Sequence, residues 1–268
     1  INKQHTKIQA SIQYAKRIQD AMLPNINKFK QHFDDAFVLF MPKDVVSGDF
    51  YWMSLPEKST GKVVIAAVDC TGHGVPGAFM SLVGDGHLNQ IVNIHQVFEP
   101  KEILQQLDLA IRNTLQQDEN NNRDGMDLSI CTYNPTDQTL CYAGAKNPLI
   151  LFQKGEMTMV KGDKMSIGGK VQKSQDKSFK QHTIDVSIPT TFYLFSDGYQ
   201  DQFGGTEDKK FMFANLKKLL TEIHQLPSDQ QKEQLLHSIT NWMKLNGQQA
   251  YPQIDDILVI GAKIAPAS

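Results

Sequence analysis

The stretch KVVIAAVDCTGHGVPGAFMS, residues 62–81, joins a strand, an acidic turn and the start of a helix. The run over residues 62–69 is β-branched and apolar, which predicts a buried strand that ends at Asp69. The glycines of TGHG mark a tight turn. Pro76 then stands at a suitable first position for a helix whose apolar face continues to residue 95. The stretch is therefore predicted to fold as a strand, a charged turn and a helix.

Short apolar runs bounded by turn residues recur along the chain, and they arrive in hairpin series. YNPTDQTL (133–140) and LFQKGEMTMV (151–160) predict hairpin connections. Helical patterns come in pairs and do not alternate with strands, which argues against a doubly wound parallel sheet. We therefore predict an α+β fold in which helical pairs flank antiparallel sheets. The expected strands are 36–40, 62–69, 128–134, 139–145, 148–152, 157–160, 191–197 and 257–264, and the expected helices are 76–95, 99–117, 211–224 and 228–246.

Length and composition set the class of protein. A chain of 268 residues with 40% apolar content can bury the core of one large domain. A net charge of −2 gives no basic field, so we predict no nucleic-acid partner. The sequence predicts neither a membrane-length apolar stretch nor a signal peptide. Three cysteines without CxxC spacing favour reduced thiols in a cytoplasmic domain, which a membrane sensor could tether in a longer protein.

Residues 1–29 are predicted to form a helical linker ahead of a main domain at 30–268. The helix ends at Pro24, and its apolar positions recur at heptad spacing with polar breaks at His5 and Gln19. One interpretation is an amphipathic helix packed on its own domain. We favour a short parallel coiled coil that forms a homodimer, or a helix continuing from an upstream sensor, because the seam is narrow. The chain begins with Ile and not Met, which favours a fragment of a longer protein. The seam comprises Ile1, His5, Ile8, Ile12, Ala15, Gln19 and Met22.

Four apolar segments each place an aspartate at their edge, where a carboxylate is costly to bury unless something neutralises it. Asp49 lies in VVSGDFYW, Asp69 in VIAAVDCTGHG, Asp197 in FYLFSDGYQD and Asp255 in QIDDILVI. A single one would be a turn residue, but four predict a shared site. Clustered carboxylates need a cation, and oxygen-only ligation without a His–Cys set favours Mg²⁺ or Mn²⁺ over Zn²⁺. Two such ions about 4 Å apart can activate a water and clamp a phosphoryl group.

His73 lies between Gly72 and Gly74, and its role has two interpretations. It is either a loop histidine that contacts substrate or a residue that only fills the turn. The flanking glycines would let the backbone approach a ligand closely, because they carry no side chains.

The motifs GDFYW, DCTGHGVPGAFMS, AGAKNPLIL, LFSDGYQDQ and QIDDILVIG, in this order and spacing, resemble the PPM-type metal-dependent serine/threonine phosphatases. Within that family the chain is similar to the bacterial branch typified by stage II sporulation protein E and the sigma-factor regulatory phosphatases. The resemblance covers roughly residues 30–264. It implies a four-layer αββα sandwich of two antiparallel sheets flanked by helical pairs, with the metals in a cleft at one edge.

The resemblance also implies roles for individual residues. Asp69 is the implied bridging ligand to both ions, and Cys70 contributes its backbone carbonyl. Asp49 is implied to bind one ion, and Asp197 and Asp255 the other. The implied cofactors are two Mn²⁺ or Mg²⁺ ions, and Asp49 is then tolerated because a cation neutralises it.

Several positions depart from the family pattern. Trp52 stands where a second acid is often found, and Leu258 replaces a common threonine. AGAKNP offers no aspartate for a third metal, so we expect two principal ions. Asp256 is expected to support its turn. Asp124 and Asp127, in RDGMDLS, are either polar loop residues or have a substrate-side or auxiliary metal role.

The function implied is a phosphoserine/phosphothreonine protein phosphatase that forms no covalent phosphoenzyme. No Cys–x₅–Arg arrangement supports a cysteine phosphatase. Substrates in the bacterial branch are usually small phosphorylated regulators, such as antagonists of anti-sigma factors. The alternative is a catalytically inactive phosphatase-fold module that only binds. A nucleotidyl cyclase, suggested by SGDFY alone, would need a βαββαβ pattern that the sequence lacks.

Overall fold

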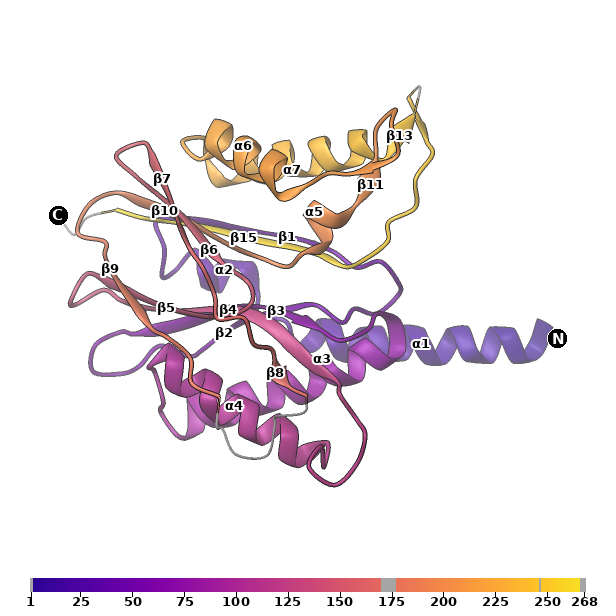
Figure 1. Cartoon of the computed structure of the whole chain (residues 1–268), viewed down its shortest axis with the longest axis horizontal. Coiled ribbons are helices and arrows are strands. Elements are labelled where there is room, and N and C mark those ends of the chain that lie inside the picture. The colour runs from indigo at the N-terminus through magenta and orange to yellow at the C-terminus, as the bar shows by residue number, and fades with distance from the viewer. Residues whose placement is uncertain (1, 170–176, 246, 266–268) are drawn as a thin grey trace.

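The computed structural model describes residues 2–169, 177–245 and 247–265. Two antiparallel sheets stack face to face, and helices cover the outer face of each (Figure 1). One apolar core fills the space between the sheets, and two further cores lie beneath the helical layers. The predicted four-layer α+β sandwich is confirmed.

The first sheet has five strands and is covered by two helices. Its order is β1-β15-β10-β6-β7, and its covering helices are α6 and α7, at the top of Figure 1. The elements are β1 (Asp35–Met41), β6 (Leu149–Gln153), β7 (Glu156–Val160), β10 (Thr190–Phe195), β15 (Ile257–Ile264), α6 (Phe213–Ile223) and α7 (Ser228–Trp242).

The second sheet has the order β2-β3-β4-β5-β9, with the short strand β8 paired to β4. Its outer face packs against α3, α4 and a π-helical turn, η1, that continues α3. The elements are β2 (Phe50–Met53), β3 (Val63–Cys70), β4 (Gly125–Asn134), β5 (Thr139–Ala145), β8 (Ile167–Gly168), β9 (His182–Asp185), α3 (Gly74–Leu88), η1 (Asn89–Ile94) and α4 (Pro100–Thr114).

The alternation of side chains along β3 explains where Asp69 comes to lie. Because successive residues of a strand face opposite sides, Ile65 and Ala67 enter the core between the sheets while Val68 and Cys70 face the helices. Asp69 continues the inward-facing row at the end of the strand. Its carboxylate therefore reaches the edge of the sandwich between the two sheets.

Some elements differ from the sequence prediction. The strand β2 was not predicted from the sequence. It places Trp52 in the core beneath the helices, where this residue is 2% exposed. Helix α7 ends at Trp242, short of the predicted 246, because a small hairpin follows in which Gly247 has a φ of 79°. Asn246 itself lies outside the described residues. The remaining short elements are α2 (Ile26–Phe29), α5 (Gly198–Asp201), β11 (Phe203–Gly204), β12 (Lys209–Lys210), β13 (Lys244–Leu245) and β14 (Gln248–Gln249).

The N-terminal helix α1 (Asn2–Met22) lies beside α3 at its C-terminal end and projects away from the sandwich at its N-terminal end (Figure 1). Ile8 is 59% exposed, whereas Gln19 is 5% exposed. The expectation that Gln19 is a polar break in a seam between two helices is therefore wrong, since it packs into its own domain. The first seam position, Ile1, lies outside the described residues. In the part of the chain that the structure describes, no helix combines the length and apolarity needed to cross a membrane.

Candidate active site

Four carboxylates are delivered to one edge of the sandwich by strands of both sheets. Asp69 lies at the end of β3 and Asp49 directly before β2, in one sheet. In the other, Asp197 lies just beyond β10 and Asp255 just before β15. Three of them, all but Asp49, line a single cavity, and Asp49 is 3% exposed. The fold thus gathers residues that are far apart in the sequence.

Burial and mutual repulsion raise the pKa values of these carboxyl groups. Burial is the first cause for Asp69, whose pKa rises to about 8, and the charges of Asp197 and Asp255 add to it. Burial, followed by the charge of Asp69, raises the pKa of Asp49 well above its ordinary value. The pKa values of Asp197 and Asp255 are raised as well, again first by burial. Without cations, the cluster therefore retains protons near neutral pH.

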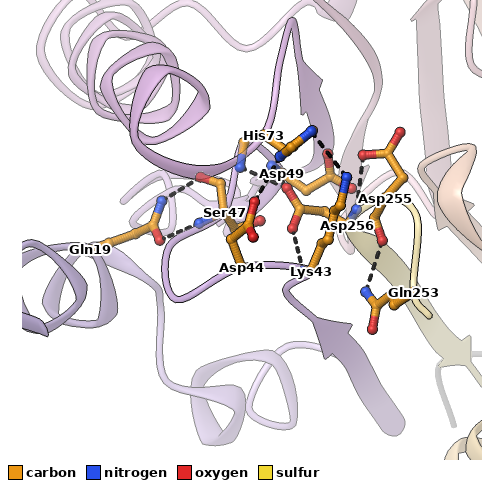
Figure 2. Close-up of polar contacts among 10 residues, drawn as sticks. Gln19, Lys43, Asp44, Ser47, Asp49, His73, Gln253, Asp255 and Asp256 are labelled. Carbon is orange, nitrogen blue, oxygen red and sulfur yellow. Dashed lines mark hydrogen bonds and ion pairs between the residues drawn. The ribbon is translucent and has the colours of Figure 1, made fainter. Parts of the chain in front are cut away.

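The loop that carries Asp49 is held on one side by Asp256 (Figure 2). The Asp256 carboxylate, 2% exposed, accepts hydrogen bonds from the backbone N–H of Lys43 at 2.7 Å and of Gly48 at 2.8 Å. A longer contact of 3.4 Å joins it to the N–H of Asp49. Asp256 thus orders the backbone next to the cluster.

On its other side the same loop is held by Gln19 of α1 (Figure 2). The Gln19 amide donates to the Ser47 carbonyl at 2.6 Å and accepts from the Ser47 N–H at 2.9 Å. It also donates to the Ser81 hydroxyl of α3 at 2.9 Å. The N-terminal helix is thereby joined directly to the backbone two residues before Asp49.

The turns around the site approach so closely that only glycine fits. A Cβ at Gly48 or at Gly77 would lie 2.3 Å from the carbonyl oxygen of Gly72. Gly72 and Gly74 have φ values of 84° and 65°, in the left-handed region that favours glycine. The glycines around His73 therefore serve the packing of the turn as well as leaving its backbone open.

His73 lies at the rim of the cavity in a short polar chain (Figure 2). Its Nδ1 is 2.7 Å from Asp44 Oδ2, and its Nε2 is 3.0 Å from Lys43 Nζ. Because a lysine ammonium only donates, Nε2 accepts from Lys43 and Nδ1–H donates to Asp44. Half of the histidine side chain is exposed, which leaves it accessible to a ligand.

Asp124 and Asp127, left open by the sequence, have different surroundings. Asp127 lines the cavity, lies opposite Asp69 in the β3–β4 register and is 3.0 Å from Lys146 Nζ. Asp124 belongs to a turn in which its side chain and backbone bond with Asn122, and it does not line the cavity. Sequence reasoning missed Lys146, which follows β5 with a φ of 61°. The only signal was its place in the AGAKNP motif.

The donor set fits hard cations. Asp49 Oδ2 is buried and has no hydrogen-bond partner among the described residues, as expected for an oxygen that awaits a cation. Burial keeps the pKa of the Cys70 thiol well above its ordinary value, so Cys70 can offer its carbonyl oxygen but no thiolate. Within residues 2–169, 177–245 and 247–265, no three or more acidic, His or Cys side chains are arranged to hold a metal as they stand.

Comparisons with known proteins agree with this architecture. A family model described as stage II sporulation protein E (SpoIIE) matches residues 59–265. The solved PP2C domain of SiaA from Pseudomonas aeruginosa is similar over 98% of this chain and 100% of that chain, with 28% identity and a TM-score of 0.85. A search of curated protein sequences found no match.

Two more distant structures share the fold. A structure with the PP2C phosphatase domain of SpoIIE from Bacillus subtilis matches over 87% of this chain and 64% of that chain, with 15% identity and a TM-score of 0.65. The structure of RsbX in complex with magnesium matches over 86% of this chain and 94% of that chain, with 17% identity and a TM-score of 0.56.

Proposed function

The chain belongs to the stage II sporulation protein E family, and on that premise we propose that it is a metal-dependent protein phosphatase acting on phosphoserine or phosphothreonine. One observation carries the proposal. Both sheets deliver carboxylates to one edge, where a buried oxygen of Asp49 has no hydrogen-bond partner among the described residues. Burying such carboxylates costs free energy unless cations neutralise their charge.

In this proposal Asp69 and the backbone carbonyl of Cys70 would help to hold two Mg²⁺ or Mn²⁺ ions, with Asp69 a ligand of both. Asp49 would be a ligand of one ion, and Asp197 and Asp255 of the other. When bound, the ions would supply Lewis acidity toward the phosphoryl oxygens and lower the pKa of the attacking water. The residues of the chain contribute the position and charge of the ligands, which Asp256 and the close-packed glycine turns keep in register.

We assign substrate-side roles to residues at the rim of the cavity. His73, held by Asp44 and Lys43, presents a polar edge toward an incoming phosphoester. The backbone of Gly72 and Gly74 is open around it. Asp127 is held by Lys146 beside Asp69, and we give it an auxiliary role in shaping the charge of the site. Asp124 stays in its turn in this proposal.

We further propose that the N-terminal helix mediates regulated dimerisation and receives the signal of an upstream sensor module. The exposed Ile8 and the half-buried Ile12 provide apolar surface on α1 beside Val75 of α3. Through Gln19, a change in the helix would reach the loop that carries Asp49. Coupling between a sensor and the active site requires a rigid element that can adopt two arrangements.

The expected substrate is a phosphorylated bacterial regulator, such as an antagonist of an anti-sigma factor, and the expected location is the cytoplasm. The cysteines Cys70, Cys131 and Cys141 are all unpaired, which suits a reducing compartment.

The proposal is tested by hydrolysis of a chromogenic phosphate ester and a phosphoserine peptide, with Mn²⁺ and with EDTA. We expect turnover that requires the metal and is abolished by the chelator. Acid quench with a ³²P-labelled substrate should trap no labelled protein, because no phosphoenzyme forms. A correctly folded protein that binds the peptide but hydrolyses neither substrate in Mn²⁺ would favour the inactive binding module instead.

A further inference from the structure

The cavity at the carboxylate cluster is lined by cations as well as by carboxylates, and we call the cationic part of the lining its wall. The cavity measures about 530 Å³, a size typical of ligand-binding clefts. The carboxylates of the lining are Asp69, Asp127, Asp197 and Asp255, and the cations of the wall are Arg123, Lys146, Lys164 and Lys177.

Two of the four cations are already used by the fold. Lys146 Nζ is 3.0 Å from Asp127 Oδ2, and Lys177 Nζ is 2.8 Å from the nearly buried Asp108 carboxylate. Arg123 and Lys164 are exposed, and among the described residues neither side chain has an ion-pair or hydrogen-bond partner. Their charges are therefore free to meet a ligand.

The segments that carry these two cations are braced against each other. Gln117, only 2% exposed, accepts a hydrogen bond from the Gly169 N–H at 2.7 Å and donates to the Asp124 carbonyl at 2.6 Å. Asp108 accepts from the Gly168 N–H at 2.8 Å. The β4–β8 pairing, with Gly125 opposite Gly168, joins the same two segments. The wall is thus built into the fold beside the cluster.

We propose that Arg123 and Lys164 select phosphorylated protein segments that carry Asp or Glu next to the phosphorylated residue. The inference rests on the proposed function, because two divalent ions would balance the charges of Asp49, Asp69, Asp197 and Asp255, while Lys146 pairs with Asp127. The phosphoryl group would then be bound at the cluster. Arg123 and Lys164 remain on the wall as positive charges without an ion-pair partner among the described residues, where the neighbouring side chains of the substrate would lie.

The test compares two phosphoserine peptides that differ only in having Asp or Asn at the flanking positions. We expect kcat/KM to be about three- to tenfold higher for the acidic peptide at low salt, mostly through KM, since each exposed pair contributes up to about 1 kcal/mol. The preference should fade in 0.5 M NaCl because salt screens exposed charges. Arg123→Gln combined with Lys164→Gln should remove it, whereas Lys161→Gln, an exposed lysine outside the cavity, should not.

Two further measurements separate this inference from the proposed function. Hydrolysis of the chromogenic ester, which has no flanking residues, should be unchanged in the double variant. Binding of fluorescent forms of both peptides, measured by anisotropy in Mn²⁺, tests the wall even if nothing is hydrolysed. Equal affinity and equal kcat/KM for the two peptides would overturn the inference. It would also be overturned if an oligonucleotide competed with the fluorescent peptide for binding as well as the unlabelled acidic peptide does. Tighter binding of the acidic peptide without any turnover would support the role of Arg123 and Lys164 and would contradict the phosphatase proposal.

Discussion

The carboxylate cluster has two halves that are anchored in different ways. On the side of the five-stranded sheet, Gln253 donates to the carbonyls of Met41 and Asp255 and so ties the turn of Asp255 to β1. On the other side, the loop of Asp49 is held by Gln19 from the N-terminal helix. One half depends on the sandwich alone, and the other also depends on a helix that projects from it. Movement of α1 would thus reach Asp49 before Asp255.

The largest expected effect is the loss of a shared ligand. Asp69→Asn should reduce Mn²⁺-dependent turnover to below about 1% of the parent, because loss of even an outer-shell partner of a metal typically costs tenfold to a hundredfold. Asp197→Asn should behave similarly, while the metal-free fold survives in both variants because one repelling carboxylate is gone. Activity assays and thermal unfolding in EDTA measure the two effects. Substantial activity in both variants would remove these residues from the site.

The second expected effect is a pH dependence of stability in the metal-free protein. The pKa of Asp69 rises from 3.8 to about 8 on folding, so the folded state binds this proton more tightly than the unfolded state. Stability contributed by the protonated group is therefore present below about pH 4 and is lost progressively as the pH rises toward 8, by at most about 1.4 kcal/mol per pH unit. Urea unfolding in EDTA at pH 5 to 8 measures the slope. Asp69→Asn should flatten it, and an unchanged slope would contradict the assignment.

A third prediction separates the two halves directly. Gln19→Leu should raise the Mn²⁺ concentration needed for half-maximal binding by about three- to tenfold, because the Ser47 N–H loses its partner and the loop of Asp49 loosens. Metal binding is read by calorimetry, with Gln13→Leu, on the exposed face of α1, as the control. Equal metal affinity in all three proteins would mean that α1 does not position Asp49.

The smallest expected effect on the site comes from the apolar surface of α1. Ile8→Asp combined with Ile12→Asp should shift the protein toward monomer and change the Mn²⁺-dependent rate by a few-fold at most, because Gln19, and not these two residues, holds the loop of Asp49 by hydrogen bonds. Sedimentation and rate are measured on the same samples. If both match the parent, the helix has no role in assembly.

The sequence predicted the sandwich well because its strands follow simple rules. The apolar run over residues 62–69 predicted a buried strand that ends at Asp69, and β3 lies there. The acidic turns stood out because a charge between apolar runs has few structural explanations. The strand β2 was not predicted because it has only four residues, FYWM, and directly follows a charged turn.

The contacts between distant segments could not be predicted. Heptad spacing marks one face of α1, but it does not show where that face is exposed, as at Ile8, or whether it meets a second helix or its own domain. Gln19 was misplaced for that reason. Likewise, the pairing of Lys146 with Asp127 depends on a left-handed turn at Lys146 whose N–H donates to the Asp163 carbonyl at 2.8 Å. Pattern reasoning carries no information on such tertiary contacts.

The most direct test of the two-ion site is the number of Mn²⁺ ions bound at equilibrium, measured by calorimetry on the parent and two variants. We expect two ions per chain in the parent. Asp49→Asn should weaken the binding of one of them, whereas Asp69→Asn should weaken the binding of both, because Asp69 would be a ligand of both ions in the proposed site. Stoichiometry and affinities that remain the same in all three proteins would contradict a two-ion centre at this edge of the sandwich.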